Sequence, residues 1–206
     1  MSTARENILK KIKQALAKPV PLPFPEAEET TVIYEAPKDE LDVTFAEAFT
    51  QLQGKFAFCF DEKEMRQQLQ QLITEKQWTK IYCKEDKWNE QFSNTINLAS
   101  CDASVTGCEC LVARTGTIVM SAAEQSGRTV SVYAPIHICI AYTNQLFFDI
   151  DDALQFIQKK YAGNIPSLIT FASGPSRTAD IEKTLVTGVH GPKEVYLFLI
   201  DSPPNN

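Results

Sequence analysis

Apolar residues along the chain follow two spacings, one typical of helices and one typical of strands. Leu41, Phe45, Phe49 and Leu52 recur every three or four residues, which predicts a helix. Compact apolar runs rich in Val, Ile and aromatic residues predict strands. The expected strands span 55–60, 80–83, 110–113, 117–120, 129–133, 137–142, 167–172 and 194–200. Further helices are expected from Asp61 to Ile73, over 86–93 and over 152–161.

Helices and strands alternate in the first half of this region, whereas the middle is dominated by strands. Such a β-α-β-α order is typical of a mostly parallel sheet that helices cover on both faces. Gly116 separates two of the middle strands and predicts a hairpin there. The sequence therefore indicates an α/β fold with a mixed, mostly parallel sheet.

The N-terminal segment has a different pattern. Residues 3–17 predict an amphipathic helix that begins with the capping pair Thr3 and Glu6. Prolines at 19, 21, 23 and 25 then favour extended backbone and exclude a helix. We expect residues 1–38 to form a helical arm with a Pro-rich linker, and residues 39–206 to form the main domain. The arm is a candidate for self-association.

Charge and hydropathy narrow the possible classes of partner. The formal net charge is −6, with basic residues dispersed among acidic ones. This distribution disfavours a nucleic-acid surface and a polybasic lipid anchor. The apolar runs have the length of strands, far below the ~20 residues of a membrane span. The N-terminus lacks the apolar core of a signal peptide, so a cytoplasmic location is expected.

The six cysteines favour packing over chemistry. Disulfides are not expected in the cytoplasm. Cys108 and Cys110 form a lone Cys-x-Cys, and only His137 and His190 could complete a metal site. We expect these cysteines to be strand residues with alternating facing, and we expect this chain to bind no metal or other cofactor.

Polar loops after and between the expected strands are the candidate sites. Ser173-Gly174-Pro175-Ser176-Arg177-Thr178 follows a strand and could hold an anion before a helix that starts near Asp180. The same residues also suit an ordinary helix cap, with Arg177 paired to Glu182. Thr115-Gly116-Thr117 could offer hydroxyl and N–H donors, or simply form a hairpin turn.

His190, held between glycines in Gly188-Val189-His190-Gly191-Pro192, is either a proton donor and anion contact or a turn histidine. The expected ligand-binding residues are thus Thr115, Gly116, Thr117, Ser173, Gly174, Ser176, Arg177 and Thr178. No catalytic residue is identified, and the candidates are His190 and Asp180.

Three segments resemble the LUD-domain family, in particular its lactate-utilisation protein C (LutC/YkgG-type) subfamily. These segments are Val105-Thr106-Gly107 through Gly116-Thr117, then Ala134 to Cys139, and then Ser173 to Glu182 with Gly188 to Pro192. The resemblance implies an α/β/α sandwich of the NagB/RpiA/CoA-transferase-like group. Many relatives have a glutamate where this chain has Arg114, which either changes the chemistry or makes the site more suitable for anions.

The resemblance also implies a role in the oxidation of lactate to pyruvate, beside partner subunits that carry Fe–S clusters. In that role the chain would bind a small anionic metabolite in a crevice at strand C-termini. Two alternatives remain open: a non-catalytic docking or assembly subunit for the Fe–S partners, and a CoA-transferase- or isomerase-like enzyme. Whether the chain is an enzyme by itself stays undecided at this point.

Overall fold

The computed structural model describes residues 4–17, 39–179 and 185–201. The chain divides into two compact units, Met1–Ala36 and Pro37–Asn206. In the first unit, α1 spans Ala4–Leu16, so the expected N-terminal helix is confirmed. The side chains of Ile8, Leu9 and Ile12 on this helix are exposed.

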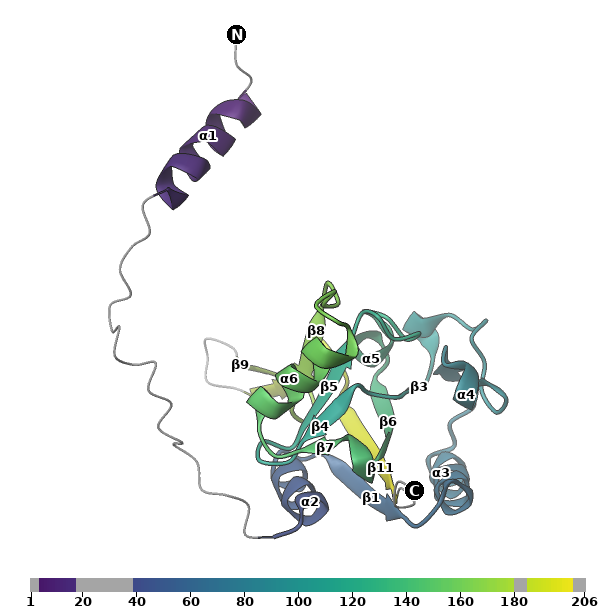
Figure 1. Cartoon of the computed structure of the whole chain (residues 1–206). Coiled ribbons are helices and arrows are strands. Elements are labelled where there is room, and N and C mark those ends of the chain that lie inside the picture. Colours follow the sequence, from purple (N-terminus) through teal and green to yellow (C-terminus); the bar gives the residue numbers. More distant parts are fainter. Residues whose placement is uncertain (1–3, 18–38, 180–184, 202–206) are drawn as a thin grey trace. The chain divides into compact units, whose positions relative to one another are not determined.

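A five-stranded sheet in the order β1-β11-β6-β3-β2 forms the centre of the second unit (Figure 1). All of its neighbouring strands run parallel. The strands span Lys55–Cys59 (β1), Ile81–Cys83 (β2), Ala103–Thr106 (β3), Ile136–Tyr142 (β6) and Glu194–Ile200 (β11). The mostly parallel sheet expected from the sequence is confirmed.

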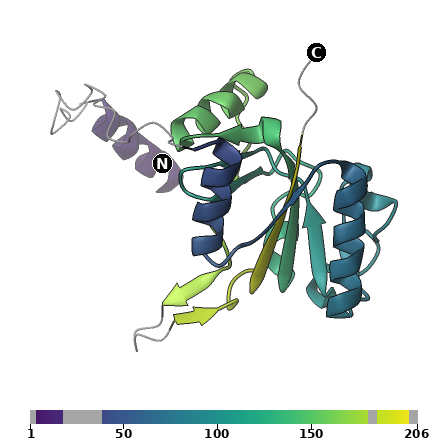
Figure 2. The same ribbon diagram turned by 90° about the horizontal axis from the view of Figure 1, so that it is seen from below.

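Helices lie on both faces of this sheet, because its strands are apolar on both sides. Helix α3 (Glu62–Lys76) covers one face and buries Met65 and Leu69 against residues of β6 and β11. Helix α2 (Leu41–Gln51) covers the other face through Phe45 and Phe49. Figure 2 shows α2 and α3 on opposite sides of the sheet.

The expected cap of α3 is present, since the Asp61 side chain accepts a hydrogen bond from the Glu64 backbone N–H at 2.7 Å. Shorter helical segments connect the strands. They are α4 (Asp86–Asn89), η2 (Leu98–Ser100) and η3 (Thr143–Gln145).

A second sheet, in the order β7-β4-β5-β8, packs beside α2. Its strands span Cys110–Val112 (β4), Thr117–Ser121 (β5), Leu146–Phe147 (β7) and Ile169–Ala172 (β8). β4 and β5 pair antiparallel around Gly116, so the predicted hairpin is confirmed. Helix α6 (Ile150–Lys160) packs on this sheet through Ala153 and Ile157 (Figure 1).

Two local expectations were wrong. Residues 129–133 were expected to form a strand, but Val130–Tyr133 form the one-turn helix α5. The N–H groups of Val132 and Tyr133 close this turn on the Thr129 carbonyl, and Val132 and Tyr133 are exposed rather than packed in a sheet. β-branched residues favour strands only where a neighbouring strand and a core face accept them.

The second error concerns residues 176–180, which were expected to lead into a helix. Instead β9 (Arg177–Ala179) pairs antiparallel with β10 (Leu185–Thr187). The backbone of Arg177 and Thr178 is therefore committed to a hairpin. Asp180, the expected start of the helix, lies outside the described residues.

Candidate functional site

Two of the hydroxyl-rich loops, those of Thr115–Thr117 and Ser173, lie together, and their hydroxyl groups bond to one another. Thr117 Oγ1 lies 2.7 Å from Thr115 Oγ1 and 2.7 Å from Ser173 Oγ. β5 begins at Thr117 and its antiparallel neighbour β8 ends next to Ser173, which brings these side chains together. The cluster is a chain of hydrogen bonds within the protein, with Thr117 itself buried.

The glycines of these loops pack against α2. A Cβ at Gly116 would lie 2.5 Å from the Phe49 backbone nitrogen, and one at Gly174 would lie 2.6 Å from the Leu52 carbonyl oxygen. Both glycines also have positive φ, 56° and 78°. The close approach that the sequence suggested for a ligand is thus occupied by the helix backbone.

The two predicted cationic contacts are also engaged within the protein. Arg177 donates a hydrogen bond from its guanidinium to the Leu52 carbonyl at 2.5 Å. Arg114 binds Asp149 through two hydrogen bonds, at 2.9 and 3.0 Å, and so anchors the N-terminus of α6. The hydrogen bond from Arg114 lowers the pKa of Asp149.

Ser176 holds the loop that carries His190. Its backbone N–H donates to the Pro192 carbonyl at 2.9 Å, its carbonyl accepts from the Gly188 N–H at 3.0 Å, and its hydroxyl donates to the His190 carbonyl at 2.9 Å. A Cβ at Gly191 would lie 2.8 Å from Ser176 Cβ. The loop backbone is therefore fixed, while the His190 side chain is exposed.

His190 lines a cavity of about 620 Å³ at the amino-terminal ends of β6 and β11. The described lining includes two side chains that can carry positive charge, His190 and Lys193, and no aspartate or glutamate. Neither the imidazole nor the Lys193 ammonium has a partner among the described residues. In a chain with 26 acidic residues, a cavity with this lining favours an anion.

The predicted site residues therefore fall into two places. Thr115, Thr117 and Ser173 form one cluster near α2, and the described lining of the His190 cavity includes none of them. Ser176 belongs to the His190 loop, although it supports that loop rather than lining the cavity. The cavity also lies at strand N-termini rather than at the C-termini named in the sequence-based expectation.

Sequence reasoning missed a buried carboxylate on the second sheet. Glu109 is buried and accepts hydrogen bonds from Ser121 at 2.5 Å, Lys160 at 2.5 Å and Tyr161 at 2.6 Å. Burial alone raises the pKa of Glu109, but the hydrogen bonds from these three side chains outweigh it and lower the pKa. The available signal was an acidic residue directly before an apolar strand run.

Glu124 lies close enough to interact electrostatically with Glu109. Burial, followed by repulsion from Glu109 and Glu85, raises the pKa of Glu124 to about 8.

Among the described residues no group of His, Cys, Asp and Glu side chains is arranged to hold a metal ion. Cys108 packs toward the parallel sheet and Cys110 toward α6. Cys108 precedes β4 instead of belonging to it, so the expectation that both cysteines are strand residues holds for Cys110 and is wrong for Cys108.

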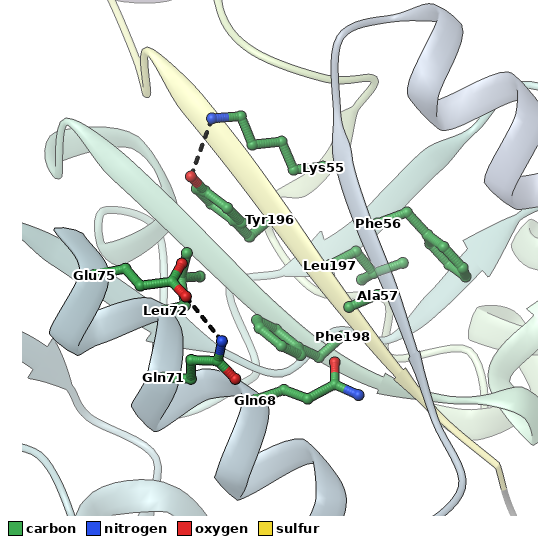
Figure 3. Close-up of a pocket in the computed structure, with 10 residues that line it drawn as sticks. All are labelled: Lys55, Phe56, Ala57, Gln68, Gln71, Leu72, Glu75, Tyr196, Leu197 and Phe198. Atoms are coloured by element: carbon green, nitrogen blue, oxygen red, sulfur yellow. Dashed lines mark hydrogen bonds between the residues drawn. The ribbon is translucent and has the colours of Figure 1, made fainter.

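A second cavity, of about 510 Å³, lies between β1 and α3 (Figure 3). Its charged groups have partners. Lys55 pairs with Glu194 and donates to the Tyr196 hydroxyl at 3.0 Å, and Glu75 accepts a hydrogen bond from Gln71 at 2.8 Å. Because its charged groups already pair with one another, this cavity should attract an anion less strongly than the His190 cavity does.

Comparison with known proteins identifies the domain. Residues 41–200 match the model of the LUD domain. The chain belongs to the LUD domain family. Relatives include a lactate utilization protein C from Bacillus licheniformis, 32% identical over 146 residues that cover 68% of this chain and 60% of the relative. Another, from Anoxybacillus flavithermus, is 30% identical over 159 residues, covering 67% and 71% of the two chains.

An uncharacterized protein from Neisseria meningitidis is 33% identical over 115 residues, covering 56% of this chain and 47% of that protein. The chain thus spans about half to three fifths of several of these relatives. The crystal structure of a DUF162 family protein from Deinococcus radiodurans superimposes with a TM-score of 0.60 at 15% identity, covering 81% of this chain and 99% of that one. This likeness supports the α/β/α fold. No helix in the described parts of this LUD protein is long and apolar enough to cross a membrane.

Proposed function

We propose that this LUD protein acts in lactate utilisation and binds a small carboxylate in the His190 cavity. The family match over residues 41–200, with relatives named lactate utilization protein C, supports the process. The observation that carries the site is the lining of the cavity. It combines an unpartnered imidazole and an unpartnered ammonium with no acidic side chain among the described residues.

The chemistry that this arrangement supports is recognition of a carboxylate. The Lys193 ammonium has three N–H donors, and the imidazole of His190 has a ring N–H for a second oxygen. Exposed charge–charge contacts of this kind are each weak, so binding of a small acid is expected in the millimolar range and should weaken with added salt.

Isothermal titration of the full chain with L-lactate and pyruvate tests this proposal. Lys193→Met should weaken binding by about fivefold or more, whereas Lys159→Met, an exposed lysine on α6, should leave it unchanged. The proposal is contradicted if neither lactate nor pyruvate binds at low salt. It is also contradicted if the Lys193→Met and Lys159→Met variants bind these acids with equal affinity.

We also propose that partner subunits carrying Fe–S clusters complete the oxidation in the cytoplasm, and that this chain holds no cofactor of its own. The exposed apolar side chains of Ile8, Leu9 and Ile12 on α1 favour the docking role. Co-purification of the full chain and of a variant lacking residues 1–38 with candidate Fe–S proteins tests that role. Equal capture of both forms would argue against docking through the arm.

A further inference from the structure

The His190 cavity has an apolar wall in addition to its cationic one. Val132 and Tyr133 come from the exposed side of α5, and Val189 comes from the loop before β11. Their exposed fractions are 39%, 64% and 54%. Large apolar side chains exposed together in a concave site indicate a ligand with an apolar part that covers them.

The backbone that carries Lys193 is fixed next to the segment that carries the apolar wall. A Cβ at Gly188 would lie 2.1 Å from Lys193 Cγ, so only glycine leaves room for the lysine stem. The Lys193 backbone N–H donates to the Pro135 carbonyl at 2.7 Å, and Pro135 itself lines the cavity. These contacts fix the Lys193 backbone beside Pro135, in the segment that carries Tyr133.

Cavity size distinguishes small ligands from larger ones. A volume of about 620 Å³ lies within the roughly 300–1,000 Å³ of ordinary ligand sites. A three-carbon acid such as lactate fills only a small part of it and has one methyl group to offer the apolar wall. An acid with a flat ring in place of that methyl group has more apolar area with which to cover Tyr133, which lines the same cavity as Lys193.

We propose that the cavity binds 2-hydroxy or 2-oxo acids with an aromatic side chain, whose carboxylate lies on Lys193 and His190 and whose ring lies on Tyr133. This inference rests on the proposed carboxylate site and extends it to the side chain of the ligand. It concerns recognition and assigns no reaction step.

Calorimetric titration of the full chain with L-lactate, L-phenyllactate and the neutral analogue 2-phenylethanol tests the inference. Burial of the ring should make phenyllactate bind about tenfold or more tighter than lactate. Tyr133→Ala should remove most of that gain, and Tyr133→Phe should keep it. Phe171→Ala removes a ring of β8 with an exposed fraction of 41% that is not part of the cavity lining, and should change neither affinity.

The outcomes separate this inference from the proposed function. Lys193-dependent binding of lactate and phenyllactate with equal affinity overturns the inference and leaves the carboxylate site in place. Tighter phenyllactate binding that survives Tyr133→Ala also overturns it. Failure of both acids to bind removes the carboxylate site and the inference together. Binding of 2-phenylethanol as tight as that of phenyllactate contradicts a role for the carboxylate.

Discussion

His137 lies in β6 of the five-stranded sheet and is almost completely buried. Its Nε2 atom is 2.8 Å from Thr106 Oγ1, and the Thr106 hydroxyl also donates to the Gly107 carbonyl. Because the Thr106 hydroxyl proton is used in that bond, Thr106 Oγ1 accepts a hydrogen bond from the imidazole Nε2–H, which sets the Nε2–H tautomer. Its place in β6 and its burial make His137 a structural residue.

Burial lowers the pKa of His137 from 6.5 to about 4, which predicts acid sensitivity. The unfolded chain takes up a proton near pH 6.5, but the folded chain does so only near pH 4. Stability due to neutral His137 is therefore complete above pH 6.5 and is lost as the pH falls to about 4. The loss is roughly 3 kcal/mol at 1.36 kcal/mol per pKa unit. Urea unfolding of wild type and His137→Gln from pH 7 to 4 measures it, and the variant should show a smaller loss.

His190→Gln is the matched control, since His137 and His190 are the only histidines of the chain. It should retain the full acid dependence of the wild type. Glu124, whose pKa is raised to about 8, acts in the opposite direction, because it destabilises the fold as the pH rises from 4.5 to 8. It is present in both proteins and cancels in the comparison. Identical pH profiles for wild type and His137→Gln would contradict the assignment.

At the scale of elements, α2 organises the loops that the sequence marked as ligand-binding. Gly116 and Gly174 approach the helix backbone at Phe49 and Leu52, and Arg177 donates to Leu52. A glycine-containing turn has the same sequence pattern whether a ligand or a helix lies against it. Only the packing of α2 decides between the two readings.

Gly116→Ala is expected to destabilise the protein by about 3 kcal/mol or more. Its φ of 56° is unfavourable for a side chain, and the new Cβ would lie 2.5 Å from the Phe49 nitrogen. Gly163→Ala provides the control, because Gly163 also has a positive φ, 83°, but nothing within 4 Å of the added Cβ. The control should lose only about 1–2 kcal/mol. If denaturant unfolding shows equal losses of stability for the two variants, α2 must move to make room for the added methyl group.

At the scale of the whole molecule, the hydrophobic clusters of the described residues all lie between Leu41 and Ile200. The first unit, Met1–Ala36, presents the exposed apolar residues of α1 instead. The buried core that resists unfolding therefore belongs to the second unit.

Deletion of residues 1–36 is expected to leave the melting temperature of the remaining chain within about 2 °C of the wild type. Thermal unfolding followed by circular dichroism, at matched protein concentrations, measures this. Light scattering on the same samples reports whether the arm supports self-association. A drop of more than about 5 °C would show that the arm contributes to the stability of the folded core.

The sequence by itself determined the α/β class, the elements with strong apolar periodicity, the β4–β5 hairpin and the cap of α3, because each depends on neighbouring residues. Tertiary structure alone decided that Val130–Tyr133 form a helix and that Arg177 begins a strand, since both depend on distant partners. It also separated His190 from the Thr115–Ser173 cluster and joined it to Lys193 and Tyr133. Spacing along a chain fixes local backbone preferences, whereas the direction in which a loop presents its side chains follows from the elements packed against it.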